Sequence, residues 1–266
     1  MKKPNFPELY FPNIISPKRI FAARKNLSWF KMVFCFILLN AILLIPISLH
    51  QAKQNDFEIL KWTSGLDSLA TNEAASQFNG LQIADGKLVS GSEMVFQDTG
   101  GVSGVFIPQK SFDASKNAIS FDEKRLRVKD ASGYSFSLAY PNSAVVTDLE
   151  EFINTTWYAQ YKPVVFLGMV FVLGTLTLVS SLMLVLFSSI CLALTKKSSF
   201  SKINSFKEAM NLTLNATGLP TIIAAVLGLI YFDITVMIGI QSLGAVLLIA
   251  MTFLKTRFYK EDVRLV

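Results

Sequence analysis

Few residues of this 266-residue chain have the types and the spacing that catalysis requires. The sequence contains a single histidine, His50, and two cysteines, Cys35 and Cys191, which both lie within apolar stretches. A serine or cysteine nucleophile needs a base within hydrogen-bond reach, and one histidine cannot supply a multi-histidine metal site. A thiol in apolar surroundings behaves as a small hydrophobic side chain. We therefore expect no catalytic residue, no bound metal ion and no cofactor, and we interpret the protein as a non-enzyme.

Carboxylates are the remaining candidates for chemistry, and they are concentrated between residues 50 and 162. This segment has fourteen acidic and ten basic residues. Composition alone leaves a glycosidase-type carboxylate pair open, but this density is also that of an ordinary solvated surface. The sequence has no P-loop, zinc or calcium motif. An unrecognised enzyme is therefore the least favoured interpretation.

Four apolar stretches without charged residues predict the elements that dominate the fold. A helix needs about 20 apolar residues to cross the hydrocarbon core of a bilayer, which is about 30 Å thick. The stretches that meet this requirement are residues 32–49, 163–194, 212–231 and 234–254. The last two are joined by a very short turn, which predicts a tight helical hairpin with Asp233 at its tip. We expect an α-helical polytopic membrane protein with four transmembrane helices.

The distribution of charge predicts the orientation of these helices. Lys and Arg in short loops remain on the cytoplasmic side of a membrane. Residues 1–31, 195–211 and 255–266 carry a combined net charge of +11, whereas residues 50–162 carry −4. We therefore expect a multi-pass plasma-membrane protein with both termini in the cytoplasm, and a lipid bilayer as its first partner. The inner segments account for the whole basic excess of the chain, so we expect no nucleic acid partner.

Residues 50–162 change from apolar blocks to short alternating segments separated by turns. This predicts a strand-rich α+β domain between the first and second spans, and the charge distribution places this outer domain on the extracytoplasmic side. Asp85-Gly86 suits the positive backbone angles of a two-residue hairpin turn. A second hairpin is predicted over residues 119–128, a turn at residues 99–101, a strand over 134–140 and helical segments over 66–78. Thr147 and Glu150 match a capping box at the start of a helix that is predicted to continue into the second span.

Several residues within and beside the predicted spans are candidates for structural roles. Asn40, Gln241, Ser180 and Ser242 are candidates for hydrogen bonds between helices, and a substrate path along them is the alternative. Ala224 and Gly228 are one helical turn apart and would allow another helix to approach closely. The candidate interfacial anchors are Trp29, Trp157, Tyr158 and Tyr161, because Trp and Tyr gather at membrane–water interfaces.

The basic inner segments contain amphipathic patterns. Ser16-Pro17 is a suitable cap and first residue of a helix. Ile20, Ala23, Leu27 and Phe30 then share one side, so residues 1–31 are predicted to lie along the inner leaflet. In the loop over residues 195–211, the residues predicted to share one helical face are Phe200, Ile203, Phe206 and Met210. Both surfaces also suit a docking partner, which is the less favoured interpretation.

The order of these segments, together with short motifs, resembles a bacterial family of membrane proteins of unknown function. The motifs are Ser16-Pro17-Lys18, Asp85-Gly86-Lys87-Leu88 and Asp98-Thr99-Gly100. Some members of that family are named maltodextrin utilization protein, and it is typical of Gram-positive bacteria. The resemblance covers nearly the whole chain. It implies a plasma-membrane protein linked to maltose and maltodextrin uptake, and it supplies no catalytic residue.

Three functions follow as hypotheses. The leading one is a non-enzymatic accessory protein whose outer domain contacts a sugar-related ligand or a partner such as a maltodextrin permease component. The second is an oligomeric transport protein, in which several copies of the chain associate around a transport path. The third is a membrane sensor that signals from the outer domain to the basic inner loop.

Overall fold

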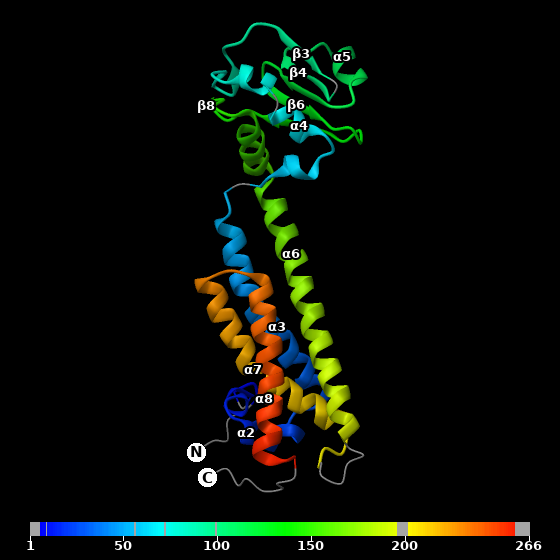
Figure 1. Ribbon diagram of the computed structural model, residues 1–266. Helices are drawn as coiled ribbons and strands as arrows, with labels where there is room; N and C mark the ends of the chain where they lie inside the picture. The colour runs from blue at the N-terminus through cyan, green and yellow to red at the C-terminus, as the bar shows by residue number, and fades with distance from the viewer. Residues whose placement is uncertain are drawn as a thin grey trace. The chain divides into compact units, whose positions relative to one another are not determined.

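The computed structural model describes residues 6–8, 10–55, 57–71, 73–98, 100–195 and 202–258. The chain forms two compact units (Figure 1). The helical unit comprises residues up to Lys53 and from Phe166 onward, and the sheet domain comprises Gln54 to Val165.

Four helices in the described part of the chain are long and apolar enough to cross a membrane, as the sequence predicts. They are α3 (Trp29–Lys53), α6 (Leu149–Leu194), α7 (Phe206–Ile230) and α8 (Ile234–Thr256). Each contains nearly all of one predicted stretch. Helix α6 runs without interruption for 46 residues, so its first turns belong to the sheet domain and the remainder to the helical unit. The predicted continuation of the domain's last helix into the second span is therefore confirmed.

Side-chain caps define where the long helices begin. Asp233, in the short turn between α7 and α8, accepts hydrogen bonds from the amides of Thr235 and Val236 at 2.8 and 3.0 Å. The predicted cap of α6 is wrong by one residue. Asp148, and not Thr147, accepts from the amide three residues later, that of Glu151, at 2.8 Å. An aspartate is at least as good a cap as a threonine, so the helix begins at Leu149.

The amino-terminal arm packs against the long helices and is part of the helical core, and its position along the inner leaflet stays a prediction. It consists of α1 (Tyr10–Ile14), α2 (Pro17–Ala22) and the 3₁₀ turn η1 (Ala23–Lys25). The Tyr10 hydroxyl donates to the carbonyl of Leu214 in α7 at 2.7 Å. Asn211, also in α7, bonds both backbone groups of Leu27. Of the predicted apolar side, only Phe30 is exposed.

The segment before α7 differs from its prediction of one amphipathic face. Helix α7 begins at Phe206, with Ser205 as its cap, so Ile203 precedes the helix. Ile203 is fully buried in a cluster with Phe21 and Phe258, which brings it into contact with the arm. Phe200 lies outside the described residues.

The sheet domain contains two sheets. A three-stranded antiparallel sheet has the order β2-β1-β8, and a five-stranded sheet has the order β3-β4-β5-β6-β7. The strands are β1 (Gln82–Ala84), β2 (Lys87–Leu88), β3 (Met94–Asp98), β4 (Gly101–Val105), β5 (Ala118–Phe121), β6 (Arg125–Lys129), β7 (Ser135–Ala139) and β8 (Ser143–Val145). Both predicted hairpins are confirmed, and Asp85 and Gly86 have positive φ angles of 50° and 69°. Strands β4 and β5 are parallel, and α5 (Gln109–Ala114) forms the crossover between them.

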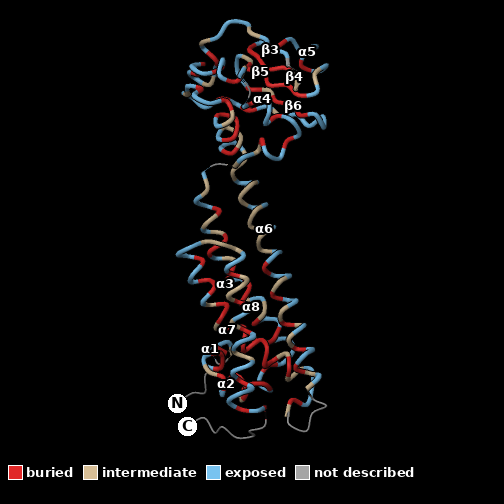
Figure 2. Tube along the Cα trace, in the orientation of Figure 1, coloured by how far each residue is buried: buried red, intermediate tan, exposed pale blue. Residues whose placement is uncertain are grey.

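Helices cover both faces of the five-stranded sheet. On one face, the main core gathers residues of the strands, of α4 (Leu66–Thr71), of the 3₁₀ turns η2 (Ile59–Trp62) and η3 (Glu73–Phe78), and of the start of α6. On the other face, Phe112 of α5 packs with Val102, Ile107 and Ala118. Every residue of β5 is buried, because it lies between these two layers (Figure 2).

Candidate functional site: an open edge of the sheet

The two edge strands of the five-stranded sheet, β3 and β7, differ in how their outer side is covered. On β7, the amide of Ala139 donates to the side-chain carbonyl of Gln160 in α6 at 3.1 Å. This bond occupies a backbone donor that would otherwise be free to pair with another strand. Strand β3 has no such cover from the described residues, so it is the open edge of this sheet.

The register of the neighbouring strands shows which backbone groups of β3 are free. Val102 of β4 donates its amide to Asn117 at 3.0 Å, on the side of β5. Backbone groups alternate in direction along a strand. Ser103, and the residues two positions before and after it, therefore bond to β3. Their partners in β3 are Met94, Phe96 and Asp98. The intervening residues, Val95 and Gln97, therefore direct their N–H and C=O groups away from the sheet.

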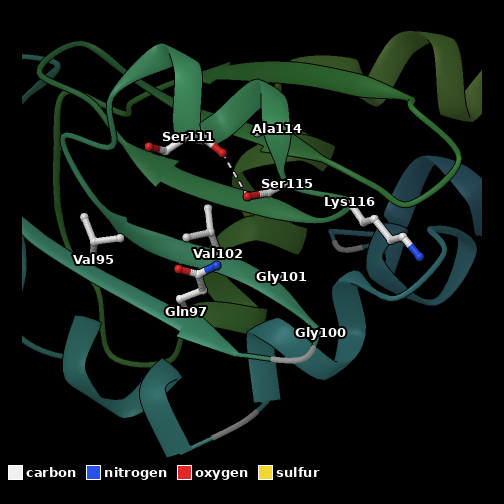
Figure 3. Close-up of a pocket in the computed structure, with 9 residues that line it drawn as sticks. All are labelled: Val95, Gln97, Gly100, Gly101, Val102, Ser111, Ala114, Ser115 and Lys116. Carbon is white, nitrogen blue, oxygen red and sulfur yellow. Dashed lines mark hydrogen bonds between the residues drawn. The ribbon is translucent and has the colours of Figure 1, made fainter.

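A groove lies beside β3 on the face that α5 covers (Figure 3). Its volume is about 410 Å³. Val95, Gln97 and Val102 form one side, and α5 and the residues after it form the other. The residues that line it are Val95, Gln97, Gly100, Gly101, Val102, Ser111, Ala114, Ser115 and Lys116. The Ser115 hydroxyl donates to the carbonyl of Ser111 at 2.8 Å, which closes the end of the helix.

A second groove, of about 560 Å³, adjoins the same strand. Its lining residues are Leu69, Glu73, Ala74, Val95, Phe96, Gln97 and Ser103. Phe96 also packs against the main core, so this groove lies toward the face that α4 and η3 cover. The free edge of β3 is therefore flanked by a groove on each face of the sheet.

Arg127 of β6 holds α5, and with it one wall of the first groove. Its guanidinium donates to both carboxylate oxygens of Asp122, at 2.5 and 3.0 Å, and to the carbonyl of Ile107 at 3.1 Å. It also donates to Gln109 at the start of α5 and lies 4.5 Å from the centre of the Phe112 ring. Such paired, charge-assisted hydrogen bonds have a fixed geometry. Arg127 thus links the wall of the groove to the sheet, together with Lys129, whose ammonium donates to the carbonyl of Asp113 in α5 at 2.7 Å.

Two buried titratable groups elsewhere in the sheet domain have shifted pKa values with clear causes. Burial raises the pKa of Tyr140, whose hydroxyl donates to the carbonyl of Asp122. Burial also acts to raise the pKa of Asp130, but hydrogen bonds from Ser132, Tyr134 and Ser64 outweigh it and lower the pKa. Both groups stabilise loops of the fold and lie outside the two grooves.

Gln241 joins three helices of the helical unit. Its side-chain oxygen accepts from the hydroxyl of Ser181 in α6 at 3.2 Å, and its nitrogen donates to the hydroxyl of Thr221 in α7 at 3.0 Å. The other residues predicted to bond between helices are not part of this arrangement. Ser180 and Ser242 are half-buried beside Ser181 and Gln241, and Asn40 donates to Phe36 of its own helix at 2.8 Å.

Ala224 and Gly228 both lie against α8. Ala224 is buried with Met237, and a Cβ atom on Gly228 would lie only 2.6 Å from the Met237 sulfur. The two small residues therefore allow α7 and α8 to pack closely, as expected for small residues at a helix contact.

The structure places the predicted interfacial anchors in different surroundings. Trp29, at the start of α3, is about half exposed. Tyr158 is buried and donates to the carbonyl of Gln54 at 3.1 Å, and Trp157 and Tyr161 pack against the core of the sheet domain. These three residues thus contact the sheet domain, and their role as membrane anchors stays a prediction.

His50 and the cysteines do not assemble into a site. The His50 ring stacks on Phe232 of the α7–α8 turn, with 4.0 Å between the ring centres. Cys35 is buried in α3 and Cys191 is exposed in α6. The described residues contain no group of three or more His, Cys, Asp or Glu side chains that could hold a metal ion.

The open edge is the feature that the sequence pattern did not reveal. The turn at residues 99–101 was predicted, and Asp98 and Gly101 do pair across it. The residues of β3, Met-Val-Phe-Gln-Asp, contain the alternation of a half-buried strand. Nothing in that pattern says which strand pairs on its second side, because pairing depends on residues distant in sequence.

These units define a multi-pass membrane protein that carries an α+β domain between its first and second long apolar helices. The chain belongs to the family described as protein of unknown function (DUF1189), whose model matches residues 10–254.

Two relatives have related names. The chain is 30% identical to "Putative maltodextrin utilization protein YvdJ" of Bacillus subtilis, over 90% of this chain and 85% of that protein. It is 26% identical to "Maltodextrose utilization protein MalA" of Streptococcus pneumoniae, over 95% of this chain and 96% of that protein. No solved structure matches.

Proposed function

We propose that this protein is a non-enzymatic accessory protein of the plasma membrane of a Gram-positive bacterium. It serves maltose or maltodextrin uptake or utilization, with the sheet domain outside the cell and both termini in the cytoplasm. The observation that carries the proposal is a folded domain with an open strand edge, borne by long apolar helices, in a chain whose relatives are named for maltodextrin utilization.

The composition of the apolar stretches supports an accessory role over independent transport. Ion-coupled transporters place ionisable residues inside their spans, where these residues bind or relay the ion. Residues 32–49, 163–194, 212–231 and 234–254 contain no Asp, Glu, Lys, Arg or His. The buried polar residue Gln241 is engaged by Ser181 and Thr221 within a single copy, which favours a packing role for it.

Growth and uptake of a deletion strain test the proposal. We expect slower growth on maltodextrin, unchanged growth on glucose, and restoration of both growth and uptake of labelled maltodextrin by the full-length chain. Equal uptake in the deletion and parent strains would contradict the proposal. Purification in mild detergent should recover a maltodextrin permease component with the full-length chain.

A sensor is the second candidate, and the continuity of α6 favours it. One helix contributes Phe152 and Ile153 to the core of the sheet domain and Leu192 to a cluster near the arm. A helix without a break can transmit a rotation or a shift along its length. The discriminating measurement is whether maltodextrin-induced expression of uptake genes is lost in the deletion strain while uptake by the permease, expressed from a constitutive promoter, is normal.

A further inference from the structure

We propose that the edge strand β3 binds an extended segment of a partner protein, which adds to the five-stranded sheet as a sixth strand. This inference rests on the proposed function, since it names the surface through which the accessory protein contacts its partner. The occupant is a strand-forming segment that carries basic residues.

The backbone of β3 sets the first requirement on the occupant. Val95 and Gln97 each present an N–H and a C=O away from β4, two residues apart. A peptide backbone in extended conformation offers the complementary donors and acceptors with the same spacing. A lipid or an oligosaccharide does not repeat donors and acceptors in this way, so the geometry selects a polypeptide.

The two grooves set the second requirement. Side chains of an added strand alternate between the faces of the sheet, and each face of the sheet beside β3 has a groove. The groove beside α5 is lined by small and polar residues such as Ser111 and Ser115, which suits a small or polar side chain. The other groove includes Leu69, Ala74 and Phe96, which suits an apolar side chain.

Charge sets the third requirement and argues against a second copy as the occupant. Two glutamates lie beside the edge, Glu93 before β3 and Glu73 in the second groove, whereas Lys116 lines the first groove. A partner strand with Lys or Arg beside Glu93 and Glu73 complements the charge of these glutamates. The β3 strand of a second copy does not meet this requirement, because residues 91–101 contain no Lys or Arg.

Site-specific photocrosslinking in intact cells tests the proposal with the full-length chain. A photoreactive amino acid replaces Ser111 in one variant and Ala74 in another, so that each groove has its own probe. We expect both probes to crosslink to the same partner, at residues an odd number of positions apart in one non-helical segment that contains Lys or Arg. Adducts at a helix, adducts only with lipid, adducts with β3 of a second copy, or no adduct each overturn the proposal.

Proline at the open edge provides the decisive variant. Val95→Pro removes an outward N–H that is not part of the β3–β4 ladder, so the sheet is expected to remain folded. We expect crosslinking from both probes to fall at least tenfold in this variant. The matched control Val95→Thr keeps the N–H, and we expect it to crosslink like the wild-type protein. Gln97→Pro is the second variant, should Val95→Pro unfold, and thermal unfolding in detergent monitors both. Crosslinking that is unchanged in a folded proline variant overturns the proposal.

The two proposals can fail separately. Loss of maltodextrin uptake in the deletion strain, together with no effect of the proline variants on crosslinking, removes strand addition and leaves the accessory role. Crosslinking that depends on Val95, in a strain whose uptake does not depend on the protein, removes the accessory role and leaves strand addition.

Discussion

Gln241 is the residue through which α6, α7 and α8 exchange side-chain hydrogen bonds, and its side chain is only 2% exposed. Replacement by leucine keeps the volume but removes both bonds. We expect the Gln241→Leu variant to lose about 1 kcal/mol of stability, because hydrogen bonds between membrane helices contribute about that much. Thermal unfolding of the purified protein in detergent measures the loss. The neighbouring Ser242→Ala variant is the control, and an equal loss in both would show that Gln241 has no special role.

Gly218 of α7 is a position at which the arm approaches this helix closely. A Cβ atom there would lie 2.7 Å from Ile14 and 2.9 Å from the Tyr10 hydroxyl. We expect Gly218→Ala to destabilise the protein by about 1–3 kcal/mol, as overpacking of a core does. The α8 residue Gly239 has open space around its Cβ position, so Gly239→Ala should be neutral or stabilising. Protease cleavage within the arm would report its release from α7, and equal cleavage in both variants would contradict this.

Asp130 makes the stability of the sheet domain depend on pH. Hydrogen bonds to its carboxylate lower its pKa in the folded state despite its burial. The stabilisation is therefore present above the unfolded pKa of about 3.9 and is lost as the pH falls through the lower folded value. We expect Asp130→Asn to unfold at lower temperature at pH 7 and to lose less stability than the wild-type protein on acidification below about pH 4. Parallel wild-type and variant curves from pH 7 to pH 2 would show that another carboxylate is responsible.

At the scale of elements, Arg127 determines how firmly α5 is held. Lysine retains the charge but cannot form the paired bonds to Asp122. We expect Arg127→Lys to increase amide hydrogen exchange throughout residues 109–114 and to cost about 2 kcal/mol. Arg125→Lys on the same strand is the matched control, because Arg125 is exposed. Unchanged exchange in α5 would mean that the packing of Phe112 and the hydrogen bond from Lys129 to Asp113 hold the helix without Arg127.

The elements themselves follow largely from local patterns in the sequence. Charge-free stretches of sufficient length identify all four long helices, and Asp85-Gly86 and the alternation after Tyr134 identify parts of the sheets. Such signals are local, since they depend on helix length, strand period and turn geometry.

Contacts between distant segments are what local patterns could not supply. The pairing of the arm with Asn211, the choice of Ser181 over Ser180 as the partner of Gln241, and the parallel β4–β5 contact all depend on tertiary packing. The burial of Tyr158 against the sheet domain belongs to the same class. The open edge of β3 does as well, because a strand is at an edge only when no other segment pairs with it. This explains why the candidate site emerged from the structure and not from the pattern of residues.

At the scale of the whole molecule, the proposed orientation follows from charge and is open to a direct test. The segments predicted inside carry +11, whereas residues 50–162 carry −4. Helix α6 begins within the sheet domain, so one labelled position reports the side of the membrane on which the whole domain lies.

Thiol labelling of intact cells provides that report. In a background with Cys191→Ser and Cys35→Ser, we expect Lys124→Cys in the β5–β6 turn to react with a membrane-impermeant maleimide, and Lys25→Cys in the arm to react only after lysis. Lys124 and Lys25 are both exposed, so a difference in labelling reflects the side of the membrane and not burial. The reverse pattern would place the open edge of β3 in the cytoplasm. A partner strand would then have to come from a cytoplasmic protein, and a role in contacting sugars or a permease from outside the cell would be excluded.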